Sequence, residues 1–267
     1  MSPLRTAAIV LRQFYLLRGS AARVLPLFTW VAIDIVLWGF LTKYLNNLFP
    51  ARFNFVPTLL GAVLLWDFFG RVMFGVTTTF LEDVWSRNFL NFFATPLTVP
   101  EYISGLVLSS VATSCVGLFA MVLLASAAFG FSFFSYGIAL LPFILVLFLF
   151  GIAMGVFASA LVLRLGPAAE WFVWPLPAVI SPFVAVFYPL STLPNWMRVI
   201  AHILPPSYVF ETVRGIIHGS RVSWLNLTLS AFLAVTYVAL AGAFFMSVFR
   251  YAVKTGLIAR YSAESVS

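Results

Sequence analysis

Three ionisable residues lie inside long apolar runs of the sequence. Asp34 falls within the first run, and Asp67 and Arg71 fall four residues apart within the second. Residues four apart share one face of a helix, and a charge at the bilayer centre costs about 2.5–3.5 kcal/mol on insertion scales. We therefore expect Arg71 to face Asp34, Asp67 or both inside the protein. The arrangement would be either a staple between helices or part of a polar transport path.

Residues for hydrolytic chemistry are poorly represented. The two histidines, His202 and His218, lie in one connector, and the sequence has no His-Glu-x-x-His pair to hold zinc. A serine–histidine dyad within the membrane needs a histidine in an apolar run, and these runs contain none. We interpret His202 as an interfacial side chain rather than a catalyst.

A phosphate-binding loop is also missing from the sequence. Such a loop ends in Lys-Ser or Lys-Thr after a glycine-rich turn, because backbone amides and the lysine hold the phosphates. Of the two lysines, Lys43 is followed by tyrosine and Lys254 has no glycine loop before it. We therefore predict that the chain is not an enzyme and has no cofactor of its own. Any ATP and Mg would be bound by another chain.

Composition indicates that the bilayer is the main solvent of this protein. The chain is 63% hydrophobic and 9% charged, whereas soluble domains carry about 25% charged residues. Its net charge of +7 comes from scattered Lys and Arg residues near the ends of apolar runs, which is typical of membrane topology and not of nucleic-acid binding. The single cysteine, Cys115, excludes a disulfide within the chain. The arginine-rich start does not resemble a signal peptide.

Six apolar runs are each long enough for the roughly 20 residues that a helical crossing requires. We predict an all-α membrane protein, one domain over residues 1–267, with six transmembrane helices. Six crossings place both termini on one side, and that side would hold nine basic residues against five on the other. This bias predicts cytoplasmic termini. The predicted crossings are 24–42, 55–80, 103–129, 137–163, 168–188 and 224–249.

Residues 1–22 are predicted to form an interfacial helix lying on the membrane. Ser2 and Pro3 suit the start of a helix. Leu4, Ala7, Ala8, Leu11 and Tyr15 follow as an apolar stripe opposite Arg5 and Arg12. The alternative is a frayed basic tail.

Residues 81–100 are polar at their start, between two apolar runs, and are predicted to form a cytoplasmic helix. Glu82 and Asp83 would lie at its N-terminal end, where the helix dipole favours anions, and Asp83 and Arg87 are spaced for an ion pair. The helix would either rest on lipid headgroups or dock on a soluble partner. One face would carry Asp83, Ser86, Arg87 and Asn91, and the other Leu81, Trp85, Phe89, Phe92 and Phe93.

The outer connector, residues 189–223, holds two helical patterns separated by Pro205 and Pro206. Each would be roughly 15 Å long, too short to cross a hydrocarbon core of about 30 Å. Because both are apolar, we predict a re-entrant helical hairpin; the alternative is a pair of helices lying flat on the outer surface. Glu211 and Arg214 share one face and would act as a structural clamp or as a gate that touches substrate.

A glycine motif in the fourth run predicts close helix packing. Gly151 and Gly155, continued by Ser159, form a small-residue stripe that lets another helix approach. The partner helix would belong either to the same chain or to a second copy.

Three segments resemble the membrane subunit of an ABC-2 type exporter. They are EDVWSRNFLNFFATPLTVPEYISG at 82–105, YPLSTLPNWMRVIAHILPPSYVFETVRG at 188–215, and the basic helix ahead of the first run. The resemblance implies a homodimer that pairs with two copies of an ABC ATPase in the plasma membrane, such as a bacterial inner membrane. Closure of the ATPase subunits on ATP would push on the membrane subunits through a coupling helix. The implied coupling residues are Glu82, Asp83, Trp85, Ser86, Arg87 and Phe89.

The resemblance also implies an activity. The chain would be a permease that moves an amphiphilic, lipid-linked or drug-like substrate out of the cytoplasm or the inner leaflet. Membrane lipid would be its surrounding partner, and nucleic acid would not be a partner. Two alternatives remain from the residues alone: a membrane-embedded enzyme that modifies lipid, and a membrane scaffold that transports nothing.

Overall fold

The structure is a computed structural model that describes residues 2–48, 56–86, 91–92, 94–132, 137–220 and 222–257. Regular structure in this part of the chain is entirely helical. Five of the described helices are long and apolar enough to cross a membrane, which indicates a multi-pass membrane protein. They are α2 (Ala21–Leu48), α3 (Gly61–Trp85, preceded by the π-helical η1, Val56–Leu60), α5 (Val99–Phe129), α6 (Leu141–Leu165) and α11 (Trp224–Lys254).

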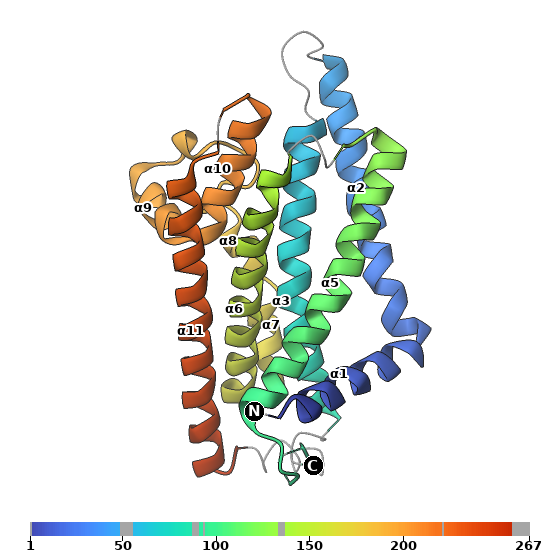
Figure 1. Ribbon diagram of the computed structural model, residues 1–267, viewed down its shortest axis with the longest axis vertical. Helices are drawn as coiled ribbons and strands as arrows, with labels where there is room; N and C mark the ends of the chain where they lie inside the picture. The colour runs from blue at the N-terminus through green and yellow to red at the C-terminus, as the bar shows by residue number, and fades with distance from the viewer. Residues whose placement is uncertain are drawn as a thin grey trace.

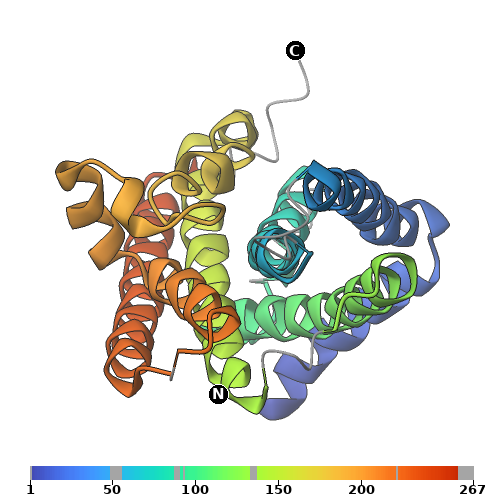
Figure 2. The ribbon, with the colours of Figure 1, turned by 90° about the horizontal axis from the view of Figure 1, so that it is seen from above.

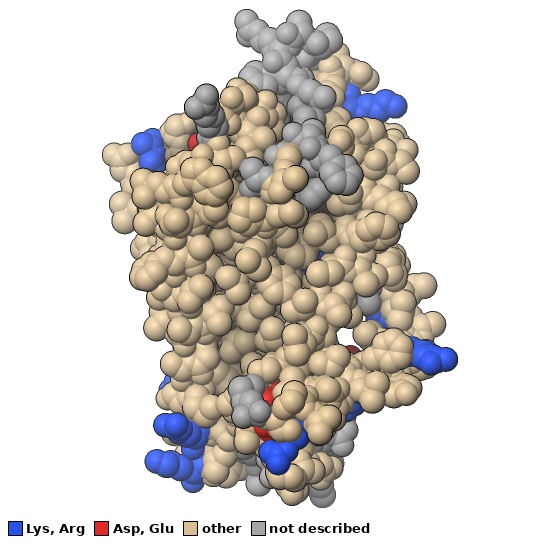
Figure 3. All heavy atoms as spheres, viewed as in Figure 1, with Lys and Arg blue, Asp and Glu red and all other residues tan. Residues whose placement is uncertain are grey.

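The long helices stand side by side, with α3 between α5 and α6 (Figures 1 and 2). α11 covers the far side of α6, and α2 packs beside α5. One end of the bundle carries α1 (Pro3–Arg18) and the last turns of α3 and α11; we name it the α1 end. The opposite end carries α9 (Asn195–Ile203) and α10 (Pro205–Ile217) and is the α10 end. Charged side chains gather toward the two ends, and the middle of the face shown in Figure 3 is almost free of them.

Glycine packing makes α3 the most buried of the five long helices. A Cβ at Gly151 would lie 2.9 Å from the Val72 Cβ, and one at Gly155 would lie 2.8 Å from the Met73 carbonyl oxygen. The backbones of α6 and α3 therefore approach too closely for any larger residue. The Thr77 hydroxyl also donates a hydrogen bond of 3.3 Å to the Gly155 carbonyl. The partner of the glycine motif in this structure is a helix of the same chain.

The ends of α5 show how sequence sets helix boundaries. The Thr98 amide donates to the Glu101 carboxylate at 2.9 Å, so that a side chain three residues ahead satisfies a free backbone donor at the start of the helix. At the other end Gly130 adopts a φ of 64°, and its amide bonds back to the Ser126 carbonyl. This left-handed conformation favours glycine and ends the helix.

The predicted crossing 168–188 is not one continuous helix. It comprises η4 (Pro167–Ala169), α7 (Glu170–Val173) and α8 (Leu176–Ile180), followed by turns. Pro175, Pro177 and Pro182 explain the breaks, because proline donates no backbone hydrogen bond and disfavours helical geometry in the residue before it.

A second correction concerns the start of the predicted coupling helix. Residues 81–85 do not begin a new helix; they are the last turn and a half of α3. Nothing in the sequence there breaks a helix, and Phe80, Leu81 and Val84 continue the buried face of α3. Residues 87–90 and 93, which hold much of the predicted helix, lie outside the described part of the chain.

The N-terminal segment is a helix, as predicted, and lies across the α1 end of the bundle (Figure 1). Ile9 and Gln13 are buried, and the Ile9 side chain sits on Gly105 of α5, where a Cβ would come within 2.6 Å of it. The predicted apolar stripe that includes Leu4, Leu11 and Tyr15 is exposed. The helix therefore presents its apolar stripe outward and packs on the bundle with the neighbouring face.

The outer connector forms two separate helices, with a short 3-10 turn, η5 (Leu190–Thr192), before them. The break between α9 and α10 falls at Leu204, which precedes the predicted proline pair. α10 packs against α6 and α11, with Val209, Phe210 and Val213 buried. α9 is mostly exposed, and its buried Ala201 belongs to a small cluster with Ala185 and Leu193.

Candidate functional site: a polar cavity inside the bundle

A cavity of about 660 Å³ lies between α2, α3 and α5. We name it the central cavity; Figure 2 shows the arrangement of α2, α3 and α5, which supply most of its lining. Its lining runs from Ala22 to Asp34 on α2 and from Glu82 back to Trp66 on α3. Because these stretches cover the first half of α2 and most of α3, the cavity extends from the α1 end past the middle of the bundle.

The three ionisable residues predicted inside the membrane all line this cavity. Asp34 comes from α2, and Asp67 and Arg71 come from α3. Both carboxylates interact electrostatically with Arg71. The guanidinium reaches across to α5, where a Cβ at Gly117 would lie 2.8 Å from the Arg71 Nη1. The absence of a side chain at Gly117 therefore leaves the space that the arginine head group occupies.

Hydroxyl groups form the α5 wall of the central cavity, a feature that the sequence interpretation missed. Ser110 Oγ donates to the Val72 carbonyl of α3 at 2.8 Å, and Ser109 Oγ donates to the Gly105 carbonyl of its own helix at 2.9 Å. Ser109, Ser110, Thr113 and Ser114 are spaced at i, i+1, i+4 and i+5, which puts them on one face of a helix. This spacing is the sequence signal that could have predicted a polar wall. The lining hydroxyls are those of Thr78 and Thr79 on α3 and of Ser109, Ser110, Thr113 and Ser114 on α5.

Three buried polar atoms in the lining have no hydrogen-bond partner among the described residues. They are Gln13 Nε2, Asp67 Oδ2 and Ser114 Oγ. Buried polar atoms are paired in the great majority of cases, with protein groups or with ordered water. Their convergence on one cavity therefore indicates a place that accepts polar ligands.

Aromatic side chains pack on the α10 side of the central cavity. The Trp66 ring lies 4.7 Å from Phe69 and 6.0 Å from Phe210, measured between centroids. Phe69 and Phe210 are fully buried. On the same side Trp38 of α2 stacks on Phe187 at 5.0 Å. The cavity therefore extends toward the α1 end and meets packed rings toward the α10 end.

Ion pairs fix α1 against the α1 end of the bundle. The guanidinium of Arg12 donates to both oxygens of Asp83, at 2.5 and 3.2 Å, and the Tyr102 hydroxyl donates to the same carboxylate at 2.7 Å. Asp83 is only 1% exposed. Although it was predicted to couple to an ATPase, Asp83 lies inside the protein and joins α3 to α1 and α5.

Two further carboxylates complete this attachment, which we name the α1 clamp: Arg5, Arg12 and Arg23 with Glu101, Asp83 and Glu82. Glu101 accepts a hydrogen bond of 2.6 Å from the Ser2 amide, and Arg5 lies 3.6 Å from it. Arg23 donates to Glu82 at 2.7 Å, and this pair is half-exposed at the rim of the central cavity. The clamp ties α1 to the end of α3 and the start of α5, and it ties the start of α2 to the end of α3.

The remaining predicted coupling residues are less enclosed. Trp85 is 51% exposed at the end of α3, and Ser86 follows it on the surface. Arg87 and Phe89 lie outside the described residues, and with them the predicted ion pair between Asp83 and Arg87.

At the α10 end, Glu211 and Arg214 form an ion pair of 2.9 Å. Arg214 also donates to the carbonyls of Ala185 and Val186, at 2.8 and 3.2 Å, and the Leu190 amide lies 3.4 Å from the Glu211 carboxylate. Ala185 has a φ of 53°, an unusual conformation for a residue with a side chain. The pair therefore holds a strained turn against α10, which favours a clamp over a gate.

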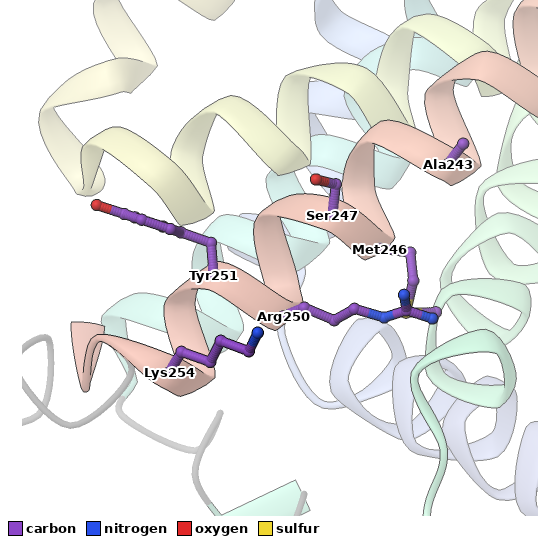
Figure 4. Close-up of a pocket in the computed structure, with 6 residues that line it drawn as sticks. All are labelled: Ala243, Met246, Ser247, Arg250, Tyr251 and Lys254. Atoms are coloured by element: carbon purple, nitrogen blue, oxygen red, sulfur yellow. The ribbon is translucent and has the colours of Figure 1, made fainter.

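A second hollow of about 490 Å³ lies on the outer face of α11 near the α1 end and is separate from the central cavity. Figure 4 shows Arg250 and Lys254 projecting from this stretch of helix. Tyr251, on the same stretch, has the Arg164 guanidinium 6.0 Å from its ring centroid. Within the described ranges, no three His, Cys, Asp or Glu side chains come together as metal ligands. Comparison with protein-family models and with curated proteins finds no match for this chain.

Proposed function

We propose that this chain is the membrane permease subunit of an ATP-driven ABC-2 exporter. The observation that carries the proposal is the central cavity, a polar space inside an apolar bundle that reaches one end of the molecule. A cavity that extends to one side and is packed with aromatic rings on the other suits one state of an alternating-access transporter. The resemblance of residues 82–105 and 188–215 to that family supplies the exporter class.

The path of the chain supports six crossings. The start of α1 and the end of α11 lie at the same end of the bundle (Figure 1), and an even number of crossings is needed to bring them there. Five are the long helices. The sixth is the broken stretch 168–188, which starts after α6 at the α1 end and reaches Arg214 of α10 through the Ala185 carbonyl. η4, at the start of this stretch, packs against α6.

The α1 end is the cytoplasmic side in this proposal. Arginines of α1 and the basic end of α11 favour that side by the positive-inside rule. The α9–α10 pair then forms the outer re-entrant hairpin. Trp196, Val199 and Ile203 of α9 are exposed, and such side chains are more stable in the outer leaflet than in water. Substrate would enter the central cavity from the cytoplasm or the inner leaflet.

Energy would enter from a separate ATPase at the α1 end. Trp85 and Ser86 are exposed there, and large exposed aromatic residues are frequent anchors of protein interfaces. Because residue 85 belongs to the same helix as Asp67 and Arg71, a push on Trp85 would act on the cavity through a single rigid element. Two copies of this chain would pair with two ATPase subunits, which bind ATP and Mg. The role of Asp83 in this scheme is to hold α1 on α3.

The test is to solubilise the chain from its own membranes and measure what co-purifies with it. We expect an ABC ATPase whose recovery depends on nucleotide, and we expect Trp85→Ala to abolish that recovery. Trp196→Ala is the matched control, because Trp196 is 62% exposed at the opposite end and its loss should leave recovery unchanged. A chain that purifies with no ATPase, or that modifies lipid by itself, contradicts the proposal.

A further inference from the structure

The central cavity carries an excess of negative charge. Its ionisable lining consists of three carboxylates and two guanidinium groups. At the rim, Glu82 is paired with Arg23 at 2.7 Å. Deeper in, Asp34 and Asp67 share the single positive charge of Arg71. One formal negative charge in the centre of the bundle is therefore not balanced by the described residues.

Asp67 is the more deeply buried of the two carboxylates in this centre. Its Oδ2 is buried in the lining with no hydrogen-bond partner among the described residues. The guanidinium of Arg71, one turn away, lies against Gly117 on the opposite wall. A buried carboxylate is costly unless a positive charge or hydrogen-bond donors accompany it. Gln13 and Ser114 line the same cavity, and each has a buried polar atom with no hydrogen-bond partner in the described part of the chain.

Three tryptophans line the same cavity as the charged centre. Trp30 lines the cavity from α2 and Trp66 from α3, while Trp174 follows α7. Trp174 is held by its Nε1, which donates to Glu170 at 2.8 Å, and by the Phe74 ring at 4.8 Å. Tryptophan is the best side-chain partner for a cation above its ring, and its flat face also buries apolar groups.

We propose that the central cavity binds an amphiphilic organic cation. The cationic group would sit between Asp67 and Asp34, and the apolar part would lie against Trp30, Trp66 and Trp174. The volume of about 660 Å³ falls within the range of about 300–1,000 Å³ that drug-sized ligands occupy. Binding itself needs no ATPase; only the export of the cation rests on the proposed function.

The experiment uses the full chain in nanodiscs of zwitterionic lipid and two probes of nearly equal size and shape. Tetraphenylphosphonium is a cation and tetraphenylborate is an anion. We expect saturable binding of tetraphenylphosphonium and no saturable binding of tetraphenylborate in equilibrium dialysis, each compared with nanodiscs that contain no protein. Asp67→Asn should weaken binding of the cation at least tenfold. Asp67→Glu, which keeps the charge, should bind within about threefold of the unmodified chain.

Two results overturn the proposal: equal binding of both probes, which indicates apolar partition alone, and unchanged binding by Asp67→Asn. If Asp67 were protonated instead of bound to a cation, the cavity lining would have no excess negative charge, and the two probes would bind equally. If Asp67→Asn does not fold, as judged by its elution and thermal unfolding, Asp34→Asn takes its place with the same expectation. Cation binding by a chain that recruits no ATPase would contradict only the exporter function, and ATPase recruitment without cation binding would contradict only this inference.

Discussion

At the scale of single residues, Asp83 shows how one carboxylate joins three helices. It lies near the end of α3 and receives hydrogen bonds from Arg12 of α1 and Tyr102 of α5. A bidentate arginine pair is stronger than an ordinary hydrogen bond and fixes the relative orientation of both groups. Asp83 is therefore a structural residue, and its burial removes it from the surface on which a partner would dock.

Asp83→Asn should destabilise the protein by about 1–3 kcal/mol, because the guanidinium of Arg12 loses its charged partner in a partly buried position. The measurement is thermal unfolding of the purified chain in detergent. Glu82→Gln provides the comparison, since the Arg23–Glu82 pair is half-exposed and such pairs contribute about 0–1 kcal/mol. Equal losses for the two variants would contradict a special role for the buried pair.

At the scale of elements, α3 is the helix that connects the parts of the molecule. α6 packs on one of its sides through Gly151 and Gly155, and α5 packs on another, where a Cβ at Gly75 would lie 2.4 Å from the Ser110 hydroxyl oxygen. Its first half supplies Asp67 and Arg71 to the central cavity, and its last turn ends in Trp85. In the proposed function, a displacement at Trp85 would be transmitted along this one packed helix.

Gly155→Ala should destabilise the α3–α6 packing by about 1–3 kcal/mol, the usual cost of overpacking a tight core. The new Cβ would meet the Met73 carbonyl oxygen at 2.8 Å, and a backbone atom within a packed helix cannot move aside cheaply. Gly242→Ala on α11 is the matched control, because a Cβ there meets nothing within 4 Å. Thermal unfolding of both variants measures the difference. A Gly155→Ala protein as stable as the control would show that the two helices are less closely packed than described.

At the scale of the whole molecule, the two ends of the bundle differ in chemistry. The α1 end carries the α1 clamp, the rim of the central cavity and the basic stretch of α11. The α10 end is packed with aromatic rings beneath the α9–α10 pair. Both the start and the end of the described chain lie at the α1 end (Figure 1). In the proposed function, this asymmetry would let the protein accept a ligand from one side of the membrane.

Cysteine labelling tests the number of crossings. Cys115 is the only cysteine, so Cys115→Ser provides a background for Arg18→Cys, Ser191→Cys and Lys254→Cys, each at an exposed position. A maleimide that cannot cross membranes should label only Ser191→Cys on intact cells. It should label the other two variants after the cells are opened. Labelling of Arg18→Cys and Lys254→Cys from opposite sides would indicate an odd number of crossings and contradict the role given to residues 168–188.

Much of the fold was predictable because it depends on local composition. Five of the six predicted crossings coincide with long apolar helices, since a run of about 20 apolar residues favours a helical crossing whatever surrounds it. The prolines of the connector correctly predicted the break between α9 and α10. By contrast, the boundary drawn after Phe80 was wrong, because polar residues do not end a helix when neither glycine nor proline follows them.

The sequence by itself determined that the chain is helical and apolar and that it carries Asp34, Asp67 and Arg71 in the middle of its runs. The tertiary structure decided which residues meet. It brought Arg12 to Asp83, 71 positions away, and it placed hydroxyls of α5 opposite the charges of α3 around one cavity. Hydropathy and helix propensity act over a few turns of chain. The pairing of distant side chains depends instead on how helices pack, and in this protein close glycine contacts and a few buried hydrogen bonds fix that packing.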